Sequence, residues 1–280
     1  MKTFAAADGR KLAYDDEGQG EAAPVLCLPG LTRDARDFEA LSAHLSSSRR
    51  VLRLDARGRG RSAHAADPMV EYTLPVETGD AIALLDHLGI EKAVVIGTSR
   101  GGLQAMGMAA SAKDRLAGVV LNDIGPVVER AGLESIIGYI GVEPKASDLD
   151  GAARSLSRTL GDQYPDLDDE GWREMARRTF HFDKDGRPGL SYDARLREPV
   201  VAVFQGPQGD LWPFFEKFEG VPLACIRGAL SNILSAETLE EMARRRPDMA
   251  HMTLPNRGHV PLLTEPEVVT FIDGFLANCP

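Results

Sequence analysis

Short apolar runs alternate with longer amphipathic stretches along most of this chain. Short runs bounded by polar or turn-forming residues are typical of buried strands, and apolar residues spaced three or four apart are typical of helices that cover a sheet. The runs predict an opening antiparallel hairpin and six further strands, at residues 3–7, 11–17, 25–28, 51–54, 94–96, 118–121, 223–226 and 249–254. This order predicts a doubly wound, mostly parallel α/β sheet, in which ligands bind at the carboxyl ends of the strands.

Helices are predicted between these strands because apolar residues recur there on one face. We interpret these faces as core packing rather than as binding surfaces. The three clearest sets are Phe38, Leu41 and Leu45; Ile82, Leu85 and Leu88; and Val268, Phe271, Ile272 and Phe275.

The regular alternation breaks in the middle of the chain. Residues 126–199 are polar, with an acidic run at residues 166–170, yet they keep helix-spaced apolar residues and several aromatic side chains. Disordered linkers are poor in aromatic residues, so an inserted helical cap is the better interpretation. We therefore predict a core made of residues 1–125 and 200–280, with a cap at residues 126–199 over the carboxyl edge of the sheet.

The most informative stretch is an apolar run that ends in Gly97-Thr98-Ser99-Arg100-Gly101 and continues into a helix-compatible segment. The pattern Gly-x-Ser-x-Gly in this context is typical of a nucleophile elbow, a sharp strand-to-helix turn that projects a serine hydroxyl beyond the sheet. Gly97 and Gly101 leave room for the turn, because a Cβ atom at either position would crowd the neighbouring strand and helix. We predict Ser99 as a nucleophile.

Charge and composition narrow the class of partner. The formal net charge is −10 at pH 7, and an acidic field attracts neither nucleic acid nor an anionic membrane surface. A charge interrupts the N-terminal residues before an apolar run of signal length develops, and no stretch approaches the ~20 apolar residues of a membrane span. We expect a cytoplasmic protein that acts on a small uncharged or apolar substrate, with no nucleic-acid or membrane partner.

The cysteines and histidines do not suggest a metal site or a disulfide framework. Cys27 and Cys225 lie inside apolar strand-like runs and Cys279 lies in the tail, so we expect buried, reduced thiols. No cluster of cysteine and histidine has the spacing of metal ligands, and we expect no metal and no organic cofactor.

Together with the elbow, four turn motifs make this chain resemble the α/β-hydrolase superfamily, and in particular its capped, bacterial serine esterase-like members. The resemblance covers essentially the whole chain. The four motifs are Leu28-Pro29-Gly30-Leu31 after the third strand, Asp55-Ala56-Arg57-Gly58-Arg59-Gly60-Arg61-Ser62 after the fourth, Asn122-Asp123-Ile124-Gly125-Pro126 after the sixth and Arg257-Gly258-His259-Val260-Pro261 after the last.

The resemblance implies that Ser99 is the nucleophile and His259 its base. A serine hydroxyl is a poor nucleophile until a neighbouring imidazole takes its proton, which histidine can do near neutral pH. The backbone N–H groups of Leu31 and Arg100 are expected to form the oxyanion hole that stabilises the developing negative charge. The Arg100 side chain is expected to pair with a nearby carboxylate, to reach the cap, or to form a surface ion pair.

An arginine cluster, at residues 57, 59 and 61, suggests phosphate binding at first sight. In the family that the chain resembles, the pattern Asp-x-Arg-Gly-x-Gly-x-Ser is a structural turn whose Asp and Arg tie loops together. We therefore expect a structural role for this cluster.

The third member of the catalytic group is ambiguous. Where the related proteins usually carry an aspartate after the seventh strand, this chain has Asn232. A neutral amide can present its NH2 group to the histidine, hold the wrong tautomer and offer no charge to an imidazolium. Three explanations are open: Asp123, after the sixth strand, supplies the acid; Asn232 is an engineered change that slows turnover; or the protein is a weakened hydrolase that binds ligand. Asp123 could also simply cap the turn that follows it.

These features predict a serine hydrolase that cleaves carboxylic esters or lactones through an acyl-enzyme on Ser99. The resemblance makes a serine at the elbow an argument against the epoxide hydrolase and haloalkane dehalogenase branches, which use aspartate there. A carbon-carbon bond hydrolase on the same catalytic residues is one alternative, and a small-ligand-binding protein on this fold is another.

Overall fold

One eight-stranded sheet forms the centre of the molecule, with strand order β1-β2-β4-β3-β5-β6-β9-β10. The computed structural model describes residues 2–206 and 209–279. The strands are β1 (Lys2–Ala5), β2 (Lys11–Glu17), β3 (Val25–Leu28), β4 (Val51–Leu54), β5 (Ala93–Thr98), β6 (Leu116–Asn122), β9 (Leu223–Gly228) and β10 (Ala250–Leu254).

The direction of the strands confirms the predicted doubly wound α/β fold. The β1–β2 and β2–β4 pairs are antiparallel, and every pair from β4 through β3, β5, β6 and β9 to β10 is parallel. The short apolar runs predicted as strands are therefore strands in the structure. Because the parallel strands run in one direction, the loops that follow β3, β5, β6, β9 and β10 meet at one edge of the sheet.

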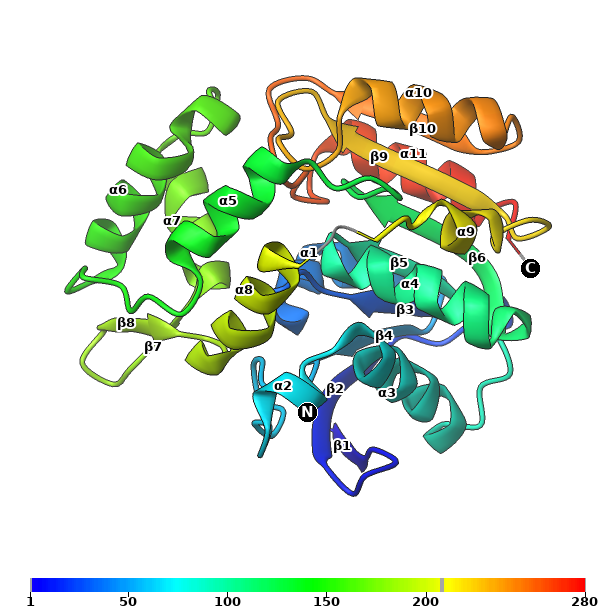
Figure 1. Cartoon of the computed structure of the whole chain (residues 1–280), viewed down its shortest axis with the longest axis horizontal. Helices are drawn as coiled ribbons and strands as arrows, with labels where there is room; N and C mark the ends of the chain where they lie inside the picture. The colour runs from blue at the N-terminus through cyan, green and yellow to red at the C-terminus, as the bar shows by residue number, and fades with distance from the viewer. Residues whose placement is uncertain (1, 207–208, 280) are drawn as a thin grey trace.

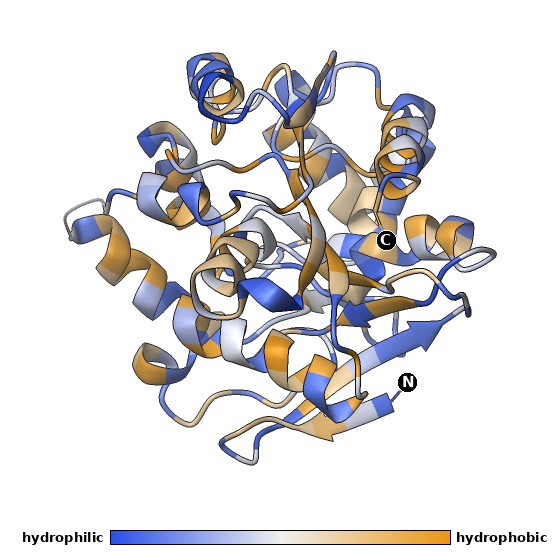
Figure 2. Ribbon diagram, turned by 90° about the vertical axis from the view of Figure 1, so that its right-hand side faces the viewer, coloured by the Kyte–Doolittle hydropathy of each residue, from blue (hydrophilic) through white to orange (hydrophobic). Residues whose placement is uncertain are grey.

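Helices cover both faces of the sheet (Figure 1). Successive strand residues point to opposite faces, so Val25 and Cys27 pack under one layer while Leu26 and Leu28 pack under the other. Most helices carry both polar and apolar residues, as Figure 2 shows. The apolar faces that the sequence predicts lie in the core. The first layer is η1 (Ala35–Phe38), α1 (Glu39–Leu45) and α11 (Pro266–Leu276); the second is α3 (Leu74–His87), α4 (Arg100–Ser111), α9 (Trp212–Glu216) and α10 (Ala236–Arg245).

None of the helices in the described residues is both long enough and apolar enough to cross a membrane.

Four further short helical segments in the described part of the chain lie in the connecting loops: α2 (Pro68–Glu71), η2 (Lys113–Arg115), η3 (Gly161–Gln163) and η4 (Ala194–Leu196).

The chain between β6 and β9 leaves the sheet and gathers beside it, at the left of Figure 1. We call residues 126–205 the cap segment. The expected helices are present, and a small antiparallel hairpin accompanies them, because the polar turn at residues 183–187 joins two short extended pieces. Its elements are α5 (Arg130–Tyr139), α6 (Leu149–Leu160), α7 (Asp169–Thr179), β7 (Phe180–Phe182), β8 (Pro188–Leu190) and α8 (Arg197–Gln205). Helix α8 runs across residue 199, where the sequence suggested a boundary.

The cap segment is bonded to loops at the carboxyl edge of the sheet. After β3, the Arg36 guanidinium donates to the carbonyl of Phe180 at 2.9 Å. After β4, the amide of Gly60 donates to the carbonyl of Ser191 at 2.7 Å. Gln163 and Tyr164 bond the loop after β10. The cap segment is therefore in contact with loops at the edge where doubly wound sheets bind their ligands.

All three cysteines are free and buried. Burial raises the pKa of the Cys27 thiol to about 12 and also raises the pKa of Cys225, to which the negative charge of Asp123 adds. The thiols therefore stay protonated at neutral pH and are packed as small apolar side chains.

Candidate active site

Ser99 occupies a strained turn between β5 and α4. Its backbone has φ 50° and ψ −113°. Residues with a side chain rarely adopt these angles, and the strained residues that do occur cluster at functional sites. A Cβ atom at Gly97 would lie 2.5 Å from the backbone of Gly101, and one at Gly101 would collide with the carbonyl oxygen of Leu28. The two glycines are needed because strand and helix approach each other closely at this turn.

A continuous chain of hydrogen bonds connects three of the predicted site residues. The Nε2 atom of His259 lies 2.9 Å from the Oγ atom of Ser99, and its Nδ1 atom lies 2.7 Å from Oδ2 of Asp123. Both distances fall within hydrogen-bond reach. A carboxylate that accepts a hydrogen bond from Nδ1–H leaves Nε2 as the acceptor for the serine hydroxyl.

Hydrogen bonds fix both carboxylate oxygens of Asp123. It follows β6 with φ 56°, a second positive φ at a predicted site residue, and it is fully buried. Its Oδ1 atom accepts from the amide of Gly228 at 2.9 Å, and its Oδ2 atom accepts from the hydroxyl of Ser231 at 2.6 Å. These bonds orient the carboxylate toward His259 and compensate for its burial.

Asn232 lies in the loop after β9, half-buried, with its backbone carbonyl oxygen packed against Gly132 of α5. Within the described part of the chain, no hydrogen bond joins Asn232 to His259. The structure thus brings Ser99, His259 and Asp123 together and does not bring Asn232 to the imidazole. The same loop contributes instead through Ser231, which bonds the Asp123 carboxylate.

The two predicted amide donors lie on segments that flank Ser99. Arg100 is the first residue of α4, and the first amides of a helix have no acceptor within the helix. Leu31 follows Gly30, where a Cβ atom would lie 3.9 Å from the Cβ atom of Ser99. This arrangement is compatible with an oxyanion hole that combines the two amides.

A buried ion network connects the two donor segments. The Arg100 guanidinium donates to Oε2 of Glu77 at 2.6 Å, and Arg59 donates to Oε1 of the same carboxylate at 2.5 Å. Arg59 also donates from Nε to the carbonyl of Leu31 at 2.9 Å. Burial acts to raise the pKa of Glu77, but Arg100 and Arg59 outweigh it and hold the pKa below its ordinary value. The network fixes the loop after β3 relative to the start of α4.

The remaining arginines of the cluster after β4 are also paired. Arg57 donates to both carboxylate oxygens of Asp80 at 2.6 Å, and Arg61 donates from Nε to Asp55 at 2.7 Å. Bidentate pairs of this kind hold backbone segments in a fixed geometry. The cluster therefore ties loops together, as expected, and does not present free cations to a phosphate.

Among the described residues, no histidine other than His259 bonds to Ser99. The others have ordinary environments: His44 pairs with Asp273 at 2.8 Å, His87 stacks on Phe4 with ring centroids 5.7 Å apart, His64 lies 3.7 Å from Asp193, and His181 and His251 are exposed.

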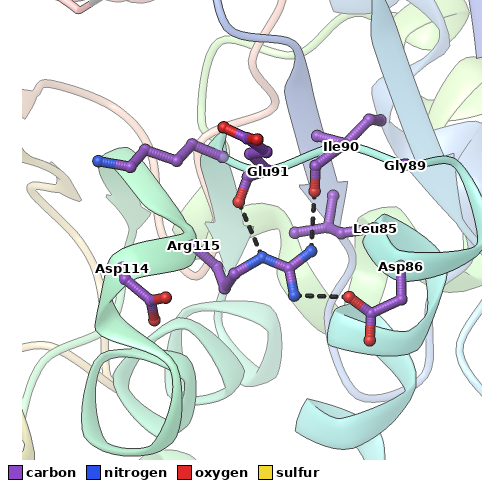
Figure 3. A pocket seen from close by; sticks show the side chains of 8 residues that line it. Leu85, Asp86, Gly89, Ile90, Glu91, Asp114 and Arg115 are labelled. Atoms are coloured by element: carbon purple, nitrogen blue, oxygen red, sulfur yellow. Dashed lines mark hydrogen bonds and ion pairs between the residues drawn. The ribbon is translucent and has the colours of Figure 1, made fainter.

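A surface hollow of about 480 Å³ lies at the opposite edge of the sheet, where β5 and β6 begin (Figure 3). The Arg115 guanidinium in this hollow is already paired: it donates to the carbonyls of Ile90 and Glu91 and to the carboxylate of Asp86. Strand starts are not where doubly wound sheets bind ligands, so we do not assign the site there.

The comparisons with known proteins decide the family. The model of the Alpha/beta hydrolase family matches residues 25–270. The chain belongs to this family. It is 33% identical over 279 residues to the 3-hydroxybutyrate-oligomer hydrolase of Cupriavidus necator, covering 96% of this chain and 93% of that protein.

Further relatives agree on fold and reaction class. The crystal structure of an alpha/beta hydrolase from Novosphingobium aromaticivorans is 44% identical, with a TM-score of 0.93 and coverage of 99% of this chain and 97% of that one. The 2-(acetamidomethylene)succinate hydrolase of Mesorhizobium japonicum is 25% identical over 261 residues, covering 91% and 90% of the two chains. This alpha/beta hydrolase is therefore a hydrolytic enzyme.

Sequence reasoning missed three residues that support this site. Glu77, Ser231 and Gln163 each bond a segment that is distant in sequence: the start of α4, the end of β6 and the loop after β10, respectively. None of them belongs to a motif. Glu77 lies in the first turn of α3, where an acidic residue is favourable for the helix dipole in any case. Its position in the sequence therefore gave no sign of its contact with Arg100.

Proposed function

We propose that this alpha/beta hydrolase is a serine hydrolase that cleaves carboxylic esters through an acyl-enzyme on Ser99. The observation that carries the proposal is the chain of hydrogen bonds from Ser99 through His259 to Asp123, with lengths of 2.9 and 2.7 Å. This is the arrangement in which a neutral histidine can activate a serine and a carboxylate can orient the histidine.

In the first half of the reaction, Ser99 Oγ attacks the ester carbonyl carbon while His259 Nε2 takes the hydroxyl proton. The carbonyl oxygen becomes negatively charged and accepts from the amides of Leu31 and Arg100. The carbon-oxygen bond to the alcohol then breaks, and the alcohol leaves with the proton from Nε2. An acyl group remains on Ser99.

In the second half, a water molecule replaces the alcohol. His259 takes one proton from the water as the oxygen attacks the acyl carbon, and it returns that proton to Ser99 Oγ as the bond to serine breaks. The products are a carboxylic acid and the free enzyme. Asp123 keeps the Nδ1 proton in place and stabilises the imidazolium that forms transiently in both halves.

The relatives support esters as the substrate class. The protein from Cupriavidus necator is named for hydrolysing 3-hydroxybutyrate oligomers, in which hydroxy acids are joined by ester bonds. We propose a small ester of this general kind, including short oligoesters and lactones of hydroxy acids, as the substrate. Aryl and short alkyl esters are expected to serve as convenient assay substrates.

The test combines an active-site probe with a substrate panel. A fluorophosphonate should label the protein stoichiometrically, and peptide mass spectrometry should place the label on Ser99. The labelled protein should lose its turnover of p-nitrophenyl esters and of 3-hydroxybutyrate dimer. Labelling with turnover only of carbon-carbon substrates would favour that branch of the family, and tight ligand binding without labelling would favour a binding protein.

The pH dependence gives a second check. Hydrolysis of p-nitrophenyl acetate should rise as the pH increases from about 5 to 8, because only the neutral imidazole can accept the Ser99 proton. The measurement is kcat/KM across this range. His259→Ala should remove most of the activity and abolish the rising limb, whereas His251→Ala, an exposed position in β10, should keep both. A rising limb that persists in His259→Ala would point to a different base.

A further inference from the structure

The loop that carries His259 is bonded to the cap segment on both sides of the histidine. The side-chain oxygen of Gln163 accepts from the backbone amide of His259 at 3.0 Å. The hydroxyl of Tyr164 donates to the backbone carbonyl of Val260 at 3.0 Å. Two consecutive cap residues therefore bond the peptide group that precedes the His259 Cα atom and the peptide group that follows Val260.

Burial strengthens these contacts. Tyr164 is only 3% exposed and packs edge-on against Trp172, with ring centroids 6.0 Å apart. Leu262, from the loop after His259, packs against the same cap cluster. Burial, with a further contribution from the charge of Asp123, raises the pKa of the Tyr164 hydroxyl, so the hydroxyl keeps the proton that it donates.

Side-chain packing and charge add two further links before the histidine. Gln163 fills the space beside Gly258, where an added Cβ atom would collide with it. Arg257 pairs with Asp166 of the cap segment and donates from Nε to Glu265 of the core at 2.8 Å. The loop is thus clamped between the cap segment and the start of α11.

We propose that Gln163 and Tyr164 are positioning residues for His259, holding the backbone that carries the imidazole in register with Ser99 and Asp123. This inference rests on the proposed function. The cap segment then does more than cover the site: seating of residues 163–166 against the loop after β10 completes the geometry of the base. A shift of about 1 Å in a catalytic group can cost on the order of 100-fold in rate.

The test uses the full chain and p-nitrophenyl acetate. Gln163→Ala should lower kcat by about 10- to 100-fold, with a much smaller change in KM, because the base is displaced while the substrate site remains. Gln163→Glu keeps an acceptor oxygen and should retain more of kcat. Tyr164→Phe removes one hydroxyl and should lower kcat by about two- to tenfold. The matched control is Asp162→Ala, at the exposed neighbouring position, which should leave kcat unchanged.

A second readout does not depend on turnover. The downfield proton signal of His259 Nδ1–H, bonded to Asp123, should broaden or shift in Gln163→Ala and stay unchanged in Asp162→Ala. Thermal unfolding checks that each variant is folded. An unchanged kcat together with an unchanged proton signal in Gln163→Ala would overturn the proposal. Absence of fluorophosphonate labelling in the wild-type protein would instead refute the proposed function, and the proton signal would still test the clamp.

Discussion

Ser99→Ala is expected to lower ester hydrolysis by on the order of 10⁴- to 10⁶-fold, leaving only the weak catalysis that binding and an oxyanion hole provide. The change removes the Oγ atom that lies 2.9 Å from His259 Nε2 and nothing else. Alanine adopts the same backbone angles at the same cost as serine, so thermal stability should hardly change. The measurement is kcat for p-nitrophenyl acetate beside a thermal melt.

A control on the same helix separates chemistry from packing. Ser111 ends α4, where its hydroxyl donates to the carbonyl of Gly107 at 2.8 Å on an exposed surface. Ser111→Ala should keep full activity and full labelling by a fluorophosphonate, while Ser99→Ala loses both. Turnover within tenfold of the parent in Ser99→Ala would remove Ser99 from the mechanism.

Asp123→Asn is expected to lower kcat by about 10⁴-fold, as the same exchange does in serine proteases. An amide can hold the imidazole in the wrong tautomer and offers no charge to the imidazolium. Its shape is conserved, so the bond from the Gly228 amide can be kept and the fold should survive. The measurement is kcat at a pH above the rising limb, with the downfield Nδ1 proton signal as a structural check.

Asn232→Asp is the partner experiment. Because Asn232 is not bonded to His259 in the described structure, a carboxylate there should raise kcat little. The opposite pattern, a large gain in Asn232→Asp and a small loss in Asp123→Asn, would make residue 232 the acid position. One pair of variants therefore distinguishes the explanations that the sequence left open.

The fold was readable from the sequence because its signals are local. Each apolar run became a strand, and Ser99 was found because the elbow depends on two glycines within two residues of it. The order of the strands was not readable, because β3 lies between β4 and β5 through crossover connections that no local pattern encodes. The β7–β8 hairpin was missed since its strands have three residues each.

The site was readable only in part, for the same reason. Asp123 and Asn232 both follow strands that end at the same edge of the sheet, so sequence position could not choose between them. The choice depends on which side chain points at His259, and this follows from the positive φ of Asp123 and its bond from Ser231. Glu77 and Gln163 act across tertiary contacts and leave no signature in the chain.

The buried cysteines make the native protein a poor target for thiol reagents and a good reporter of its own unfolding. Cys27 lies in the core layer beneath α1 and α11, and Cys225 lies in the layer beneath α3 and α4, so each face of the sheet carries one buried thiol on a central strand. An alkylating reagent can reach them only during opening events, whose frequency depends on the free energy of those openings. If the sheet opens as one cooperative unit, the two sulfurs should be alkylated at equal rates, whereas unequal rates, resolved by peptide mass spectrometry, would reveal which layer of helices comes away first.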